Sequence, residues 1–143
     1  MKNYLRRAGI DTERLEGRCG IRTVDEDRRC AYLLFRALMA VPYYDHSVVC
    51  EYGRLCENEN EVLSFLYRKC GFSSHYVCTE RKGWINEGYT KVYIGEDLFI
   101  ADLTLSRALE WSGQEKVDES NFLMTLAEYG LKRRAFYESE NEQ

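Results

Sequence analysis

The residue types at three positions of this sequence could carry acyl-transfer chemistry. Cys56 stands at the start of a predicted helix, Asp102 closes a predicted strand 46 residues later, and Glu87 lies between them. A cysteine attacks as its thiolate, and the N-terminus of a helix stabilises that anion. The spacing is typical of a cysteine–histidine–aspartate site, in which an imidazole accepts the thiol proton and later delivers it to a leaving group. Glu87 stands where that histidine is expected.

Glutamate is a poor substitute for an imidazole. A carboxylate with a pKa of about 4 accepts little of the proton of a thiol whose pKa is about 8.5, and its negative charge raises the thiol pKa further. The chain has two histidines, His46 and His75. His46 lies in the loop before Cys56 and is the better candidate for a substitute base, because His75 opens a predicted strand. Each also fits an ordinary surface or hydrogen-bonded histidine.

The elements that must position these residues are helices first and a small antiparallel sheet after them. Thr23 and Glu26 form a capping box at the start of the first helix, and Pro42 lies just beyond its end. The expected elements are a short turn of helix at 4–7, helices at 25–40, 56–70 and 118–129, and strands at 75–80, 89–94 and 98–102 with a turn at 95–97. Asp118 is expected to cap the last helix and Gly130 to end it. This order of elements predicts an α+β fold.

The segment from Cys56 to Phe72 carries a recognisable pattern. Cysteine is followed by Asn60, Leu66, Arg68 and a terminal Gly71-Phe72. In this register it resembles the nucleophile helix of the transglutaminase-like cysteine superfamily, and most closely that of the arylamine N-acetyltransferases. Three further stretches resemble the same family: Tyr4-Leu-Arg-Arg-Ala-Gly9, Ala40-Val-Pro-Tyr-Tyr44 and Gly88 to Asp102. The resemblance covers roughly residues 4–112.

The resemblance implies a papain/transglutaminase-like core in which helices pack on a small antiparallel sheet. It also implies a triad, and counting back fifteen residues from Asp102 to the family's histidine gives Glu87. Asn58 and Gly53-Arg54 stand where the family has a glutamate and paired glycines. The family's C-terminal domain, which helps cover acetyl-coenzyme A, is missing or reduced to one helix and a tail. No cofactor is therefore expected, and acetyl-coenzyme A enters only if the chain is an active enzyme.

Composition bounds the class of protein. We expect one domain at 1–137, since 143 residues with 45% hydrophobic content can fill a single core, and a frayed acidic tail at 138–143. The net charge of −4 argues against direct nucleic-acid binding, and no apolar run approaches the ~20 residues of a membrane span. Six cysteines without a C-x-x-C pair indicate free thiols in a cytoplasmic protein and no metal site.

Two functions fit these observations. In the first, the chain is a degenerate pseudoenzyme that binds a protein partner or small ligand, as a regulator or inhibitor, through its former active-site face. In the second, it is an active cysteine acyltransferase or amidase with an unusual base. Aromatic side chains make good binding anchors, and the candidate binding residues are Tyr43, Tyr44, Arg54, Trp84 and Tyr89. The oligomeric state is left open.

Overall fold

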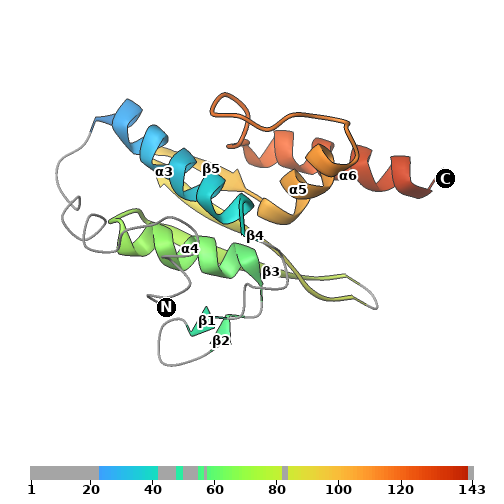
Figure 1. Ribbon diagram of the computed structural model, residues 1–143, viewed down its shortest axis with the longest axis horizontal. Helices are drawn as coiled ribbons and strands as arrows, with labels where there is room; N and C mark the ends of the chain where they lie inside the picture. The colour runs from blue at the N-terminus through green and yellow to red at the C-terminus, as the bar shows by residue number, and fades with distance from the viewer. Residues whose placement is uncertain (1–22, 42–47, 50–54, 57, 82–83, 142–143) are drawn as a thin grey trace.

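The computed structural model describes residues 23–41, 48–49, 55–56, 58–81 and 84–141 of the chain, with the backbone alone at 48–49, 55–56, 79–81, 84–87, 137 and 139–141. The described residues form an α+β arrangement, as predicted (Figure 1). Its helices are α3 (Val24–Met39), α4 (Glu59–Lys69), α5 (Leu103–Trp111) and α6 (Leu126–Asn141). Its strands are β1 (Val48–Val49), β2 (Leu55–Cys56), β3 (Ser74–Arg81), β4 (Trp84–Ile94) and β5 (Asp97–Ala101).

The main sheet is a meander in the order β3-β4-β5, antiparallel throughout. Its register pairs Val77 with Tyr89 and Thr90 with Ala101. Gly95 turns the chain between β4 and β5 at φ +63°, a left-handed conformation that glycine adopts readily. Because β5 pairs only with the last part of β4, the β3–β4 ribbon projects beyond the body of the sheet (Figure 1). A separate two-stranded pair joins β1 to β2.

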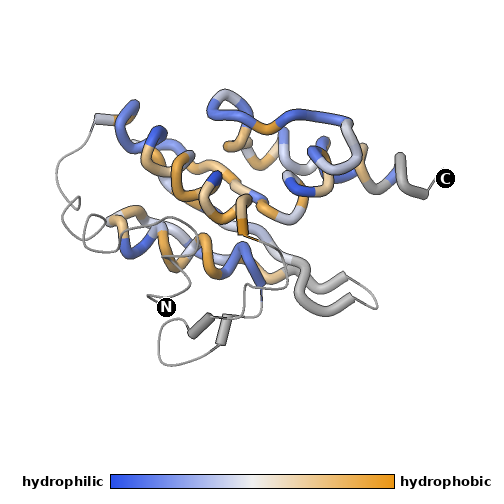
Figure 2. The backbone as a smooth tube through the Cα atoms, in the orientation of Figure 1, coloured by the Kyte–Doolittle hydropathy of each residue, from blue (hydrophilic) through white to orange (hydrophobic). Residues whose placement is uncertain are grey.

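Helices α3 and α4 bury one face of this sheet. Thr23 caps α3, with its hydroxyl accepting a hydrogen bond from the Glu26 N–H at 3.2 Å, as the capping box predicted. The Tyr67 hydroxyl of α4 donates to the Ala31 carbonyl of α3 at 2.9 Å, so the two helices are joined inside the core. The hydrophobic parts of both helices and the sheet meet at the centre of the molecule (Figure 2).

A second apolar cluster fills the space between the opposite face of the sheet and the last two helices. Strand residues alternate between faces, so Ile100 points away from α3 and α4, whereas Ala101 belongs to their core. Ile100 also forms an isolated antiparallel bridge with Met124. The cluster consists of Ile100, Leu105, Leu109, Met124, Tyr129 and Phe136. It fixes α5 and α6 against β5.

Several predicted elements require correction. The last helix begins at Leu126 rather than at Asp118, because Thr125 and Glu128 exchange side-chain-to-backbone hydrogen bonds there while Asp118 closes a turn with Ser120. It passes through Gly130 and includes residues 138–141, which the sequence assigned to a tail. Helix α5 was not predicted, and β4 starts at Trp84 instead of Tyr89. The turn of helix expected at 4–7 lies outside the described residues. No helix in the described part of the chain is long and apolar enough to cross a membrane.

Candidate functional site

The N-terminus of α4 is the centre of the candidate site. We predicted that Cys56 opens this helix, and that prediction is wrong: Cys56 ends strand β2, opposite Val48, and the N-cap is Asn58. The Asn58 side chain accepts a hydrogen bond from the Asn60 N–H at 2.8 Å, and asparagine is among the best N-cap residues. The first residue of the helix, Glu59, therefore lies three residues after the cysteine.

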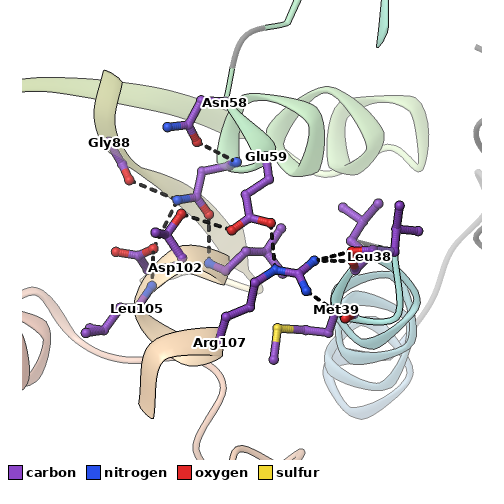
Figure 3. Close-up of polar contacts among 12 residues, drawn as sticks. Leu38, Met39, Asn58, Glu59, Gly88, Asp102, Leu105 and Arg107 are labelled. Atoms are coloured by element: carbon purple, nitrogen blue, oxygen red, sulfur yellow. Dashed lines mark hydrogen bonds and ion pairs between the residues drawn. The ribbon is translucent and has the colours of Figure 1, made fainter. Parts of the chain in front are cut away.

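Asn60 connects α4 to the sheet and to α5. Its side chain is fully buried, and its amide donates to the Gly88 carbonyl at 2.9 Å and to Asp102 at 3.0 Å (Figure 3). Its side-chain oxygen accepts from the Leu103 N–H at 2.8 Å, and the Thr90 hydroxyl donates to its backbone carbonyl at 2.6 Å. A single asparagine thus ties three segments together inside the protein.

Asp102 is a buried N-cap. One carboxylate oxygen accepts from the Asn60 amide and from the Leu105 N–H, both at 3.0 Å, and the other accepts from the Tyr129 hydroxyl at 2.7 Å. Burial raises the pKa of Asp102 above its ordinary value, although these three donors act in the opposite direction. The carboxyl that the sequence assigned to a triad is held by an asparagine, a backbone N–H and a tyrosine.

Near this network, the partly buried Arg107 of α5 forms an ion pair with the buried Glu59 of α4. The Arg107 Nε donates to Glu59 at 2.8 Å, and the Glu59 side chain is completely buried. Burial raises the pKa of Glu59 above its ordinary value, while the positive charge of Arg107 opposes the shift. The Thr104 hydroxyl donates to the other Glu59 oxygen at 3.0 Å. Every buried side-chain nitrogen and oxygen atom in the described residues has a hydrogen-bond partner.

Tyrosines border this network on the sheet side. Tyr89 is half-buried, and its ring packs on that of Tyr129 with centroids 5.0 Å apart. The Tyr76 ring lies over Gly88, so a Cβ at that position would overlap its ring and hydroxyl. Burial raises the pKa of the Tyr76 hydroxyl, and the adjacent Cys78 and Glu61 raise it further.

The structure brings together only part of the predicted site. Tyr129 contacts both Tyr89, by packing of the two rings, and Asp102, by a hydrogen bond from its hydroxyl. Of Glu87 and Trp84 only the backbone is described, paired with Thr79 and Arg81 in the β3–β4 ribbon. His75 is exposed on β3, opposite Lys91. The remaining predicted site residues lie outside the described residues: Tyr43, Tyr44, His46 and Arg54.

Sequence reasoning missed Glu59, Tyr76, Arg107 and Tyr129. One signal was available in the sequence. Asp102 precedes Leu103 and Leu105, and an aspartate at such a position can be the N-cap of a following helix as well as the end of a strand. That signal would have predicted α5 and placed Arg107 on it, one turn from Thr104. The contacts of Tyr76 and Tyr129 depend on packing and carry no local sequence mark.

Comparisons of the chain with models of protein families, with curated proteins and with solved structures give no match. In the part of the chain that the structure describes, no group of three or more histidine, cysteine or acidic side chains is arranged to hold a metal ion. The arrangement around Asn60 and Asp102 joins α4, β4, α5 and α6, and its donors and acceptors are directed at one another. Its evident chemical role is to hold these elements in place.

Proposed function

We propose that this protein is a catalytically degenerate, acetyltransferase-like domain that binds a protein partner or small ligand through the face of its former active site. The observation that carries the proposal is the environment of Asp102. In a working triad the acid orients an imidazole, whereas here both carboxylate oxygens accept from Asn60, Leu105 and Tyr129. The position between nucleophile and acid carries Glu87, which is a poor base for a thiol.

The proposed ancestry is supported by the order and packing of the elements. A helix that follows Cys56 packs on a three-stranded antiparallel meander, and Asp102 directly follows the third strand. This is the arrangement that the resemblance to the transglutaminase-like superfamily implies for a papain/transglutaminase-like core. We therefore also propose that the chain belongs to this superfamily and that residues 1–137 form a single domain.

The proposed binding face combines Tyr89 with Tyr43, Tyr44, Arg54 and Trp84. Tyrosine and tryptophan supply large contact areas at small entropic cost, and arginine adds a planar charged group. The net charge of −4 favours a protein or small-molecule partner over nucleic acid. A regulator or inhibitor acting in the cytoplasm without a cofactor fits these properties best.

The reactivity of Cys56 tests the proposal. We expect alkylation of Cys56 by iodoacetamide, followed by peptide mass spectrometry, to show an apparent pKa of about 8.5 or higher, because Glu87 stands where the imidazole of a triad is expected. The exposed Cys78 provides a reference within the same sample, and the buried Cys30 and Cys70 report on unfolding. An apparent pKa below about 7 for Cys56 would instead favour an active cysteine acyltransferase or amidase with an unusual base.

A further inference from the structure

Helix α6 carries apolar residues on two opposite faces. Its inner face holds Tyr129 and Phe136, which are buried in the second apolar cluster. Successive residues of a helix are turned by about 100°, so Leu131 points about 140–160° away from both of these rings. The Leu131 side chain is accordingly exposed, with 68% of its surface accessible. The exposed residues within about 60° of Leu131 form a stripe that we call the outer face of α6: Ala127, Glu128, Leu131, Arg134 and Ala135.

The outer face is open to another helix. Figure 1 shows α6 at the periphery of the molecule, with its C-terminal part extending past α5. Beside Leu131, a Cβ added at Gly130 would meet nothing within 4 Å beyond its own helix in the described part of the chain. The short side chains of Ala127 and Ala135 flank Leu131 one turn away on either side, and small residues let two helix backbones approach closely. A helix that packs on one side only normally has polar residues at the centre of its other side.

The outer face is complementary to itself in one orientation. When two copies of a helix pack antiparallel about a two-fold axis through Leu131, a residue before it faces the residue equally far behind it in the other copy. Ala127 and Ala135 are each four positions from Leu131, so each alanine faces the other. Glu128 and Arg134 are each three positions away, so each acid faces a base. Parallel packing would instead place Glu128 against its own copy.

We propose that two copies of this chain associate through the outer faces of α6, packed antiparallel about Leu131. The charge arrangement favours a second copy over a membrane surface, because membrane-binding helices combine a broad apolar face with several basic residues. One pair of short helices buries less than the ~1,200 Å² at the lower end of stable interfaces. The dimer is therefore weak and reversible, with a dissociation constant of about 10–500 μM. This surface goes beyond the proposed function, since it needs neither Cys56 nor a ligand.

Sedimentation equilibrium of the full chain under reducing conditions tests the proposal, at protein concentrations of about 5 μM to 1 mM. We expect a monomer–dimer equilibrium for the unmodified chain and a dissociation constant at least about tenfold higher for Leu131→Gln, because the apolar centre of the interface is lost. Leu126→Gln is the matched control. Leu126 is 60% exposed on the same helix, but it points about 140° away from Leu131, so its dissociation constant should stay within about twofold.

A charge exchange tests the register. At an ionic strength of about 20 mM, where screening is weak, R134E places an acid opposite Glu128 of the second copy and should weaken the dimer. E128R places a base opposite Arg134 and should do the same. In an equal mixture of the two variants each acid again faces a base, so the mixture should associate more tightly than either variant alone.

A chain that remains monomeric up to the highest concentration would overturn the proposal. So would a dimer that Leu131→Gln leaves intact, or one that Leu126→Gln weakens equally. Circular dichroism and urea unfolding of dilute samples should match the unmodified chain for Leu131→Gln, because the side chain is exposed in the monomer. The result does not depend on the Cys56 alkylation experiment, which decides the proposed function.

Discussion

At the scale of single residues, the site depends on a few buried side chains that hydrogen-bond to one another. Asn60 and Asp102 are separated by 42 positions yet share a buried hydrogen bond, and each binds a further backbone N–H. An unpartnered buried polar group costs roughly 1–3 kcal/mol, so the loss of one member affects the others. The same applies to Gly88, whose carbonyl accepts from Asn60 and whose Cα lies under Tyr76.

Gly88→Ala should destabilise the protein by about 1–3 kcal/mol, since the added methyl group overlaps the Tyr76 ring and forces it to move. The change is measured as the free energy of unfolding in urea. In a Tyr76→Ala background, Gly88→Ala should cost much less, because the ring is gone. Equal losses in the two backgrounds would show that Tyr76 is not the obstacle.

At the scale of elements, α3, α4 and the three main strands followed from their sequence patterns. Local signals in the sequence agree with the observed ends of these elements. They are the capping box of Thr23 and Glu26, Gly71 after α4, and the turn at Gly95 between two strands. The missed elements had competing local marks. Asp102 fits both a strand end and an N-cap, and Asp118 fits an N-cap although Thr125 and Glu128 form the reciprocal capping box.

The start of α6 can be tested with Thr125→Ala, which should lower the unfolding free energy by about 1 kcal/mol because an N-cap is lost. Circular dichroism at 222 nm should fall slightly in the same variant. Asp118→Ala is the matched control, since Asp118 closes a turn with Ser120 outside any helix. A larger loss of helical signal in Asp118→Ala than in Thr125→Ala would contradict the boundary at Leu126.

The contacts that connect elements could not be predicted from the sequence. Arg107 reaches Val41 and Glu59 only because α5 crosses the ends of both helices, and Tyr129 reaches Asp102 from α6. No periodicity or motif in the sequence predicts such contacts between elements. The candidate triad positions, by contrast, came from a linear pattern, and the described partners of Asp102 are Asn60, Leu105 and Tyr129.

At the scale of the whole molecule, two buried carboxyls should shape the response to pH. The pKa values of Glu59 and Asp102 are both raised by burial. For such groups the folded state binds protons more readily than the unfolded state. Their contribution to stability is therefore fully present below the ordinary pKa near 4 and is lost as pH rises through the raised value.

We expect Glu59→Gln to lessen any gain in unfolding free energy between pH 7 and pH 5, relative to the unmodified chain. Urea unfolding at the two pH values measures the difference, which isolates Glu59 from the many exposed carboxyls common to both proteins. Asp118, whose pKa is lowered by its hydrogen bonds with Ser120, has the opposite sign and is unchanged in the comparison. A larger gain on acidification in Glu59→Gln would contradict the raised pKa.

The central claim is that Asp102 holds the fold together and does not serve a proton relay. The most direct measurement is the rate of Cys56 alkylation between pH 6 and 8 in Asp102→Asn beside the unmodified chain, with urea unfolding of the same samples. The account predicts alkylation rates within about twofold of each other and a measurable loss of stability, because the asparagine amide nitrogen cannot accept the hydrogen bond that one of the two Asp102 oxygens accepts. A fall of about tenfold or more in Cys56 alkylation, with stability unchanged, would show that Asp102 acts on the thiol and would contradict the account.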